Sequence, residues 1–197
     1  MSGRHPRDEL GRVLPHAWWP DDRQAPGELE FVRRFCNSIN RENGAERFAT
    51  SVALDRWLVS EGAAPLHASR AGLVRVIAVR EALHDLVVAN ATGRGDVAAW
   101  EALADAAGEM SFRVVVEHDQ PVLRPGGPAI DVFIARVVAA VLAARRDGSW
   151  ERLKACRNCH WVVFDPSKNR SSRWCSMTAC GGRHNAREYR RRLRSAG

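Results

Sequence analysis

Cys156-Arg157-Asn158-Cys159 and Cys175-Ser176-Met177-Thr178-Ala179-Cys180 are two thiol pairs separated by fifteen residues near the C-terminus of a 197-residue chain, and they use four of its five cysteines. A tight turn between paired cysteines places two sulfurs on one metal ion, and an intervening hairpin can deliver the second pair. The spacing therefore predicts a structural zinc site with Cys156, Cys159, Cys175 and Cys180 as its ligands.

Two other uses of paired cysteines fit the chain less well. A redox pair needs a strand before it and a helix that begins at it, whereas residues 161–164 (Trp-Val-Val-Phe) are typical of a strand. Disulfides occur in exported proteins, and residues 1–22 lack the apolar core of a signal peptide. The longest apolar run, residues 137–144, is far shorter than the roughly 20 residues that cross a bilayer. We therefore expect a cytoplasmic protein that does not contact a membrane.

Positive charge is concentrated on the cysteine-containing segment. Residues 151–197 carry twelve lysines or arginines against three acids, a net charge of +9, whereas residues 1–150 carry eighteen against twenty, a net charge of −2. Basicity confined to one module beside a metal site is typical of a nucleic-acid contact.

The basic residues fall into two groups. Residues 183–194 have a helical composition, with four arginines on one stripe, and a second group lies in the loop between the thiol pairs, among Ser and Asn side chains that suit phosphate oxygens. The predicted nucleic-acid contacts are Lys168, Arg170, Arg173, Arg183, Arg187, Arg190 and Arg194. On the same helix we expect Glu188 to pair with Arg192. A solvated helix end, where cations favour the helix dipole, is the alternative interpretation of the stripe.

The opposite side of this helix carries Ala186, Tyr189 and Leu193, whose spacing predicts packing onto the zinc site. His184 lies four residues after Cys180 and is an alternative ligand, although four thiols already satisfy the metal. Four thiolates leave no open coordination position, so a catalytic zinc is not expected.

The cysteine segment resembles the CGNR zinc finger family over nearly all of the last forty residues. The resemblance is carried by Cys156-x-x-Cys159-x-Trp161, Phe164-Asp165, Ser167 to Arg170, Arg173-Trp174-Cys175 and Cys180-Gly181-Gly182-Arg183. The family signature reads Cys-Gly-Asn-Arg, so Gly182 stands where Asn is usual. The four thiols are intact, and metal binding should survive this difference.

The upstream part of the chain resembles the ABATE domain that accompanies this finger. The resemblance rests on residues 30–41, with Asn37-Ser38, and on Leu54 to Leu58 followed by Gly62. It implies a bacterial stress-induced transcription regulator, in which the large domain senses a signal and the finger binds DNA.

Without the family, apolar periodicity and punctuation predict a mainly α fold. We expect helices over residues 28–43, 51–61 with Ser51 as N-cap, 67–90, 96–107 and 130–148, and a small β-hairpin from residues 112–117 and 121–124. The expected domains are a flexible arm (1–27), in which Trp18-Trp19 could dock on the core, a helical ABATE-like domain (28–148), and a treble-clef or ribbon-like zinc finger (149–197) that ends in a basic helix. Trp150 and Leu153 should anchor the finger.

No catalytic constellation emerges. The pairs His84-Asp85 and Glu117-His118 are adjacent in sequence, so their side chains are not expected to cooperate, and phosphate-binding loops and nucleophile elbows are absent. Cys36 lies on an apolar helix face and is expected in the core.

The sequence therefore predicts a zinc-dependent DNA-binding regulator that is not an enzyme. The main alternative is a protein-interaction adaptor whose finger binds an acidic partner, and RNA binding is a third. A small-molecule effector of the helical domain and a homodimer remain open, since one finger reads few base pairs.

Overall fold

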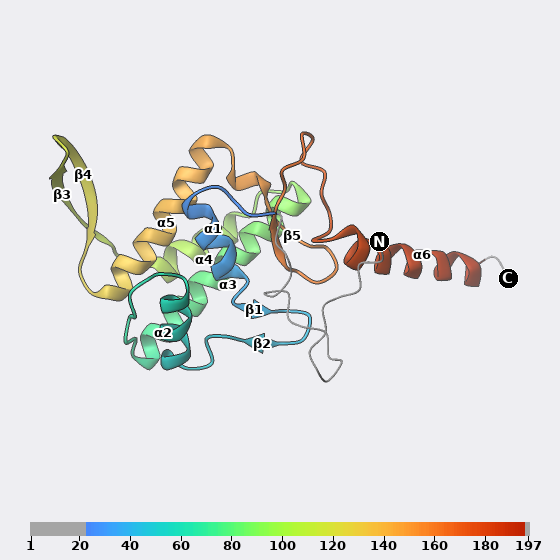
Figure 1. Cartoon of the computed structure of the whole chain (residues 1–197), viewed down its shortest axis with the longest axis horizontal. Helices are drawn as coiled ribbons and strands as arrows, with labels where there is room; N and C mark the ends of the chain where they lie inside the picture. The colour runs from blue at the N-terminus through green and yellow to red at the C-terminus, as the bar shows by residue number, and fades with distance from the viewer. Residues whose placement is uncertain (1–22, 196–197) are drawn as a thin grey trace.

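The structure is a computed structural model that describes residues 23–195 (Figure 1). The N-terminal domain contains helices α1 (Glu28–Cys36), α2 (Ser51–Ser60), α3 (Arg70–Thr92), α4 (Val97–Ala107) and α5 (Ala129–Asp147). Between them lie the short pair β1 (Ile39–Asn40) and β2 (Ala45–Glu46) and the hairpin β3 (Ser111–Glu117) and β4 (Gln120–Gly126). This confirms the predicted helical domain with a small hairpin.

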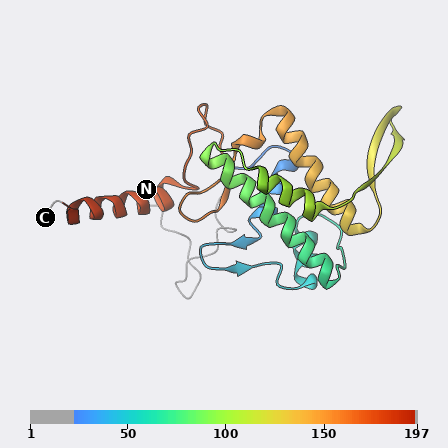
Figure 2. The ribbon, with the colours of Figure 1, turned by 180° about the vertical axis from the view of Figure 1, so that it is seen from behind.

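The C-terminal module follows directly on α5. A 3-10 turn, η2 (Trp150–Arg152), leads into the antiparallel strands β5 (Leu153–Ala155) and β6 (Val162–Phe164), and the first thiol pair lies in the turn between them. A long loop leads to the π-helical turn η3 (Met177–Gly181) and then to α6 (Gly182–Ser195), which projects away from the body (Figures 1 and 2). A hairpin turn and a helix start that each supply two cysteines form the predicted finger with its basic terminal helix.

Local signals explain where several helices begin and end. The Asp96 carboxylate accepts a hydrogen bond from the N–H of Ala99 at 3.0 Å and so caps α4, whose predicted range begins at this residue. The helices α3 and α5 end at Gly93 and Gly148, which have φ of 69° and 74°. Glycine adopts this left-handed conformation without strain, so both helices stop there.

Two boundaries differ from the prediction. The helix predicted over residues 28–43 ends at Cys36, because the chain turns at Asn40 and Gly44 to form the β1–β2 pair, and the side chain of Asn37 bonds to β6. The N-cap of α2 is Thr50, whose hydroxyl accepts from the N–H of Ala53 at 3.1 Å, and not Ser51. Tertiary contacts determine where α1 ends, and the hydroxyl of Thr50 determines where α2 begins. The spacing of apolar residues predicts neither boundary.

The domain core is aromatic where α1, α2 and α5 meet. Phe35 lies within 6.0 Å, centroid to centroid, of the rings of Phe48, Trp57 and Phe133. One apolar face of α3, from Val76 to Val87, completes this core. Arg80 is buried on this face of α3, at a position where the helical periodicity would place an apolar residue. Its charge is compensated by an ion pair with Glu46 at 2.7 Å.

The predicted flexible arm lies largely outside the described residues, and Trp18 and Trp19 lie there too. Residues 23–27, which end this segment, contact both modules. The carbonyl of Arg23 accepts from the N–H of Phe164 at 3.3 Å, and the N–H of Ala25 donates to Glu30 at 2.8 Å.

The finger is bound to the helical domain by polar side chains as well as by apolar packing. Trp150 and Leu153 are buried in the main core, as predicted. The amide of Asn37 bonds to β6 in both directions, donating to the carbonyl of Val162 and accepting from its N–H, both at 2.8 Å. The amide of Asn90 donates to the carbonyls of Trp150 at 2.9 Å and Leu153 at 3.1 Å. Asn37 thus acts as an additional strand partner for β6.

Replacing Asn37 by Ala should leave the N–H of Val162 buried without its partner. We expect the free energy of unfolding to fall by about 1–3 kcal/mol, because one unsatisfied buried polar group costs about this much. Urea denaturation measures this. Asn43→Ala, which removes an exposed turn bond to the N–H of Ala45, is the control, and an equal loss in both variants would contradict the strand-partner role.

Candidate metal centre and basic helix

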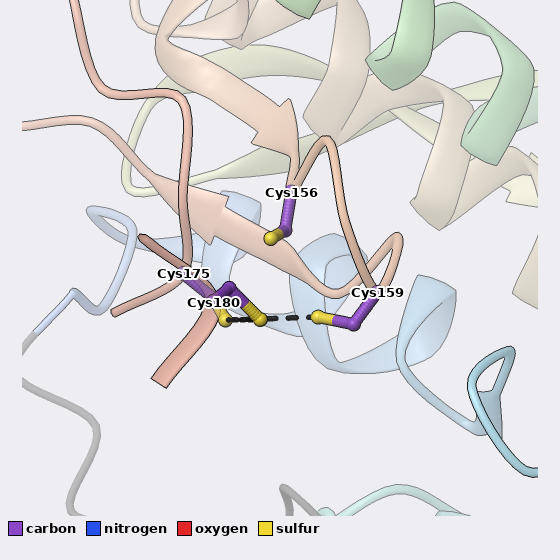
Figure 3. Close-up of side chains that lie close together, drawn as sticks. All are labelled: Cys156, Cys159, Cys175 and Cys180. Atoms are coloured by element: carbon purple, nitrogen blue, oxygen red, sulfur yellow. Dashed lines mark hydrogen bonds between the residues drawn. The ribbon is translucent and has the colours of Figure 1, made fainter. Parts of the chain in front are cut away.

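The four finger thiols converge on one point. One sulfur from each of Cys156, Cys159, Cys175 and Cys180 lies within 4.8 Å of the other three, and all four cysteines are free (Figure 3). The Sγ of Cys175 lies 3.6 Å from that of Cys159 and 3.5 Å from that of Cys180. Cys156, Cys159 and Cys180 are buried, and Cys175 is partly exposed.

These distances fit a shared metal ion and not a disulfide. A disulfide joins sulfurs at about 2.05 Å, whereas four sulfurs placed tetrahedrally at about 2.3 Å from a zinc ion lie about 3.8 Å apart. Hydrogen bonds from the thiols of Cys159, Cys175 and Cys180 lower the pKa of Cys156 far below its ordinary value, whereas the same contacts raise the pKa of Cys159 and Cys175. A cation among the sulfurs would hold them as thiolates, the form that binds metal, and the convergence of four sulfurs fits such an ion.

Two side chains support the sulfur of Cys180. The amide of Asn158 donates to this Sγ at 3.5 Å, and the guanidinium of Arg183 donates to it at 3.1 Å. Arg183 also forms an ion pair with Glu42, which raises the pKa of the guanidinium above its ordinary value. Of the seven predicted nucleic-acid contacts, Arg183 is therefore the one whose charge is directed at the metal site and at the helical domain.

The first thiol turn is held from α3. His160, next to Cys159, has φ of 61°, and its carbonyl lies 3.1 Å from the Nε2 of His84. His84 is buried, and this burial lowers its pKa to about 4. A neutral imidazole that donates from Nε2 fits this contact. His84 is thus part of the connection between the modules.

The loop between the thiol pairs is organised by one buried carboxylate. Asp165 accepts hydrogen bonds from the N–H of Ser167 at 3.0 Å and from the N–H and hydroxyl of Ser172 at 2.9 and 2.8 Å. It also forms an ion pair with Lys154 at 3.1 Å. Lys168, Arg170 and Arg173 are carried on the exposed side of this loop.

The helix α6 does not pack as predicted. Within the described part of α6 no residue is buried, and Ala186, Tyr189 and Leu193 are exposed instead of covering the cysteine cluster. The space against the cysteines is filled by Trp161 and Trp174, and Trp174 stacks on His184 at 4.7 Å between ring centroids. His184 is thus a packing residue outside the sulfur cluster.

The arginine stripe beyond the first turn of α6 faces solvent. Arg187, Arg190 and Arg194 are exposed, and Arg187 donates to the Oδ1 of Asn158 at 3.0 Å. Glu188 pairs with Arg191 at 2.8 Å, so the predicted pair with Arg192 was wrong, since the acid selected the i+3 neighbour. Asn158 bonds both to Arg187 and to Cys180 and connects the start of the stripe to the thiols.

The glycines that begin α6 differ in the space around them. A Cβ at Gly181 would lie 3.0 Å from the Sδ of Met177 and 3.1 Å from Trp174, whereas one at Gly182 would meet only the carbonyl oxygen of Met177 at 3.6 Å. A side chain at position 181 would therefore require Met177 and Trp174 to shift. Position 182 has room for a side chain.

Several of these residues were not identified from the sequence. Asn37, Glu42 and His84 lie more than seventy residues before the first thiol, and their polar contacts with the finger depend on the tertiary fold. Spacing could have suggested Asn158, which lies between two ligands. Cys36 is buried, and this burial raises its pKa to about 12, as expected of a core thiol.

His84 makes the docked finger sensitive to acid. Its pKa is about 4 in the folded chain and about 6.5 when unfolded, so its stabilising contribution is complete above pH 6.5 and is lost as pH falls toward 4. We expect wild type to lose about 3 kcal/mol more than His84→Gln between pH 7 and pH 4. Denaturant titrations at each pH measure this, and parallel pH profiles would contradict the assignment.

Comparison with known families agrees with this architecture. The CGNR zinc finger matches residues 152–193, and the ABATE family, described as "Putative stress-induced transcription regulator", matches residues 29–152. A search of curated proteins finds no match to the chain. None of the helices over residues 23–195 is long and apolar enough to span a membrane. The ABATE family description points to a regulator rather than an enzyme. Because the match to ABATE covers more than half of the chain, the chain belongs to the ABATE family, with a C-terminal CGNR zinc finger.

Proposed function

We propose that the four thiols hold one structural zinc ion. The support is the closeness of the sulfurs, their burial, and the polar donors directed at Cys180. Zinc would supply most of the positive charge that four converging thiolates require, since Arg183 contacts the sulfur of Cys180, and four thiolate ligands leave the metal no position for substrate. Free cysteines of this kind suit the reducing cytoplasm, where we place the protein.

Replacing Cys175 by Ser should lower the bound zinc from one ion per chain to nearly none. The finger should then unfold, because metal binding contributes on the order of 10 kcal/mol to such modules, while the circular dichroism of α1–α5 is retained. Metal analysis after gel filtration measures the stoichiometry. Cys36→Ala, which removes the thiol outside the cluster, should keep its zinc. A Cys175→Ser protein that retains zinc would contradict the site.

DNA is the partner that we propose for the finger. The observation that carries this proposal is the exposed α6 stripe of Arg187, Arg190 and Arg194, in which Arg187 also bonds to Asn158 at the base of the helix. Lys168, Arg170 and Arg173 add a second exposed basic group on the loop that follows β6. Arg183 is expected to contribute indirectly, by orienting the first turn of α6 against Cys180. A helix anchored at one end and cationic along its length suits the phosphates beside a groove.

Binding to random-sequence duplex DNA should weaken steeply with salt. If about four phosphates are neutralised, log K should fall against log salt with a slope near −3.6. The variant Arg187→Ala/Arg190→Ala/Arg194→Ala should bind weakly and show a shallower slope. Fluorescence anisotropy across a salt series measures both.

A matched control removes three arginines elsewhere. Arg56, Arg70 and Arg146 are exposed on the helical domain, and their triple Ala variant loses the same charge. It should bind DNA nearly as well as wild type. Equal losses in the two triple variants would indicate a general charge effect and reject a specific surface on α6.

One observation also favours the adaptor function. Tyr189 and Leu193 are 65% and 57% exposed beside the arginines, so α6 is both apolar and cationic. Such a helix suits an acidic groove on a protein. Folded, zinc-loaded protein that fails to bind DNA would support this second function.

Signal sensing by the helical domain is likewise a proposal. A cavity of about 410 Å³ lies where α3, α4 and α5 meet the finger. Trp100, Arg145, Trp150, Lys154 and Arg170 are among its lining residues. Its size is within the range of small-molecule sites, and Arg170 would connect it to the basic loop.

A further inference from the structure

The β3–β4 hairpin extends from the end of the molecule opposite α6 (Figures 1 and 2). Its strands pair from Ser111 with Gly126 to Glu117 with Gln120. The two turn residues, His118 and Asp119, have φ of 51° and 61°, as a two-residue type I′ turn requires. The hairpin is therefore a regular two-stranded ribbon in which side chains alternate between two faces.

The two faces differ in chemistry. One carries only apolar side chains: Phe112, Val114, Val116, Pro121, Leu123 and Pro125. The other carries Arg113, Arg124, Glu117 and Gln120 around a central pair of valines, and Arg124 forms an ion pair there with Glu117 at 2.5 Å. This is the pattern of a sheet that rests one face on a core.

The exposure of the faces is reversed from that pattern. Phe112, Val114, Val116 and Leu123 are 50%, 68%, 74% and 65% exposed, whereas Val115 and Val122 on the polar face are half-buried. Within residues 23–195 nothing covers the apolar face. Isolated hairpins are marginally stable in water, and an exposed apolar face of this kind marks an interaction site.

The exposed area is large enough for a dimer contact. The four exposed apolar residues leave roughly 500 Å² accessible per copy, so packing two such faces together would bury at most about 1,000 Å² in total, the lower end for a specific interface. The sheets would lie about 10 Å apart, as in a β-sandwich.

The absence of charged side chains on the apolar face favours a second copy of this chain as its partner. The apolar face has no charged side chain and so matches neither a basic nor an acidic partner, but it is complementary to itself. Net charge is −2 over residues 1–150 and +9 over residues 151–197, and the hairpin lies at the end away from the cationic finger (Figure 1). Contact there keeps the two fingers apart and exposed. We propose that two copies dimerise about a two-fold axis by packing the apolar faces of their β3–β4 hairpins, with Val114 near the centre.

Sedimentation velocity of the full-length, zinc-loaded protein tests this proposal without DNA. Wild type should sediment as a species of twice the 21.9 kDa chain mass, with a concentration-dependent boundary. In Val114→Lys, two cations would face each other across the axis, so the dissociation constant should rise at least about a hundredfold. Val59→Lys, at an exposed valine of α2, and Arg113→Gln, on the polar face, should remain dimeric.

Cross-linking identifies the face. Treatment with a short bismaleimide should join two chains of Val114→Cys and should not join Arg113→Cys, whose thiol lies on the outer side of the hairpin. Unchanged far-UV circular dichroism and thermal midpoint would show that Val114→Lys is folded. A wild type that is monomeric at all concentrations, a Val114→Lys protein that is still dimeric, or equal cross-linking of the two cysteine variants would each overturn the proposal.

Discussion

The finger depends on holding four cysteine sulfurs within 4.8 Å of one another, because thiolates at this separation repel each other. Two loops that are far from forming a core by themselves converge only if a cation sits among the sulfurs or if the sulfurs keep their protons. The protein supplies partial positive charge at this point, through the amide of Asn158 and the guanidinium of Arg183 on Cys180. The same two residues define where α6 begins, because Asn158 also accepts from Arg187 and Arg183 also bonds to Glu42. Metal chemistry and the direction of the basic helix are therefore coupled.

The second constraint is the docking of this finger onto the helical domain. Its first strands are bonded by Asn37, His84 and Asn90, and its aromatic residue Trp150 lies in the main core. A finger on a flexible tether would search for its partner independently. Here the hairpin and the first thiol turn share hydrogen bonds and apolar packing with α1 and α3, so movement in the helical domain has a direct mechanical path to the metal site. Arg170 and Lys154, which line the cavity at this boundary, lie on that path.

Most of the architecture was predictable because it rests on local chemistry. Apolar periodicity located α3, α4 and α5, Asp96 and Gly148 marked helix ends, and paired cysteines identified the metal centre. The failures share a cause. The helix predicted through residue 43 stops early because Asn37 is used by β6, 125 residues away, and Arg183 is diverted from the stripe by Glu42, 141 residues away. Polar contacts at such separations leave no periodic trace. The helix α6 is amphipathic, as its sequence indicates, but Tyr189 and Leu193 do not pack on the cysteines because two tryptophans already occupy that space.

Over residues 23–195, the contacts of α6 with the rest of the chain lie in its first two turns, through Arg183, His184 and Arg187, so the remainder of the helix projects freely from this base. Fourteen residues at about 1.5 Å each make it roughly 20 Å long, so a tilt of about 10° at its base would move its tip by 3–4 Å. That displacement is comparable to the length of a hydrogen bond, which is enough to bring an arginine at the tip into or out of reach of a phosphate oxygen. Small rearrangements around Cys180 and Asn158 would thus be magnified at Arg194, and the size of this displacement would depend on the stiffness of the first two turns of α6.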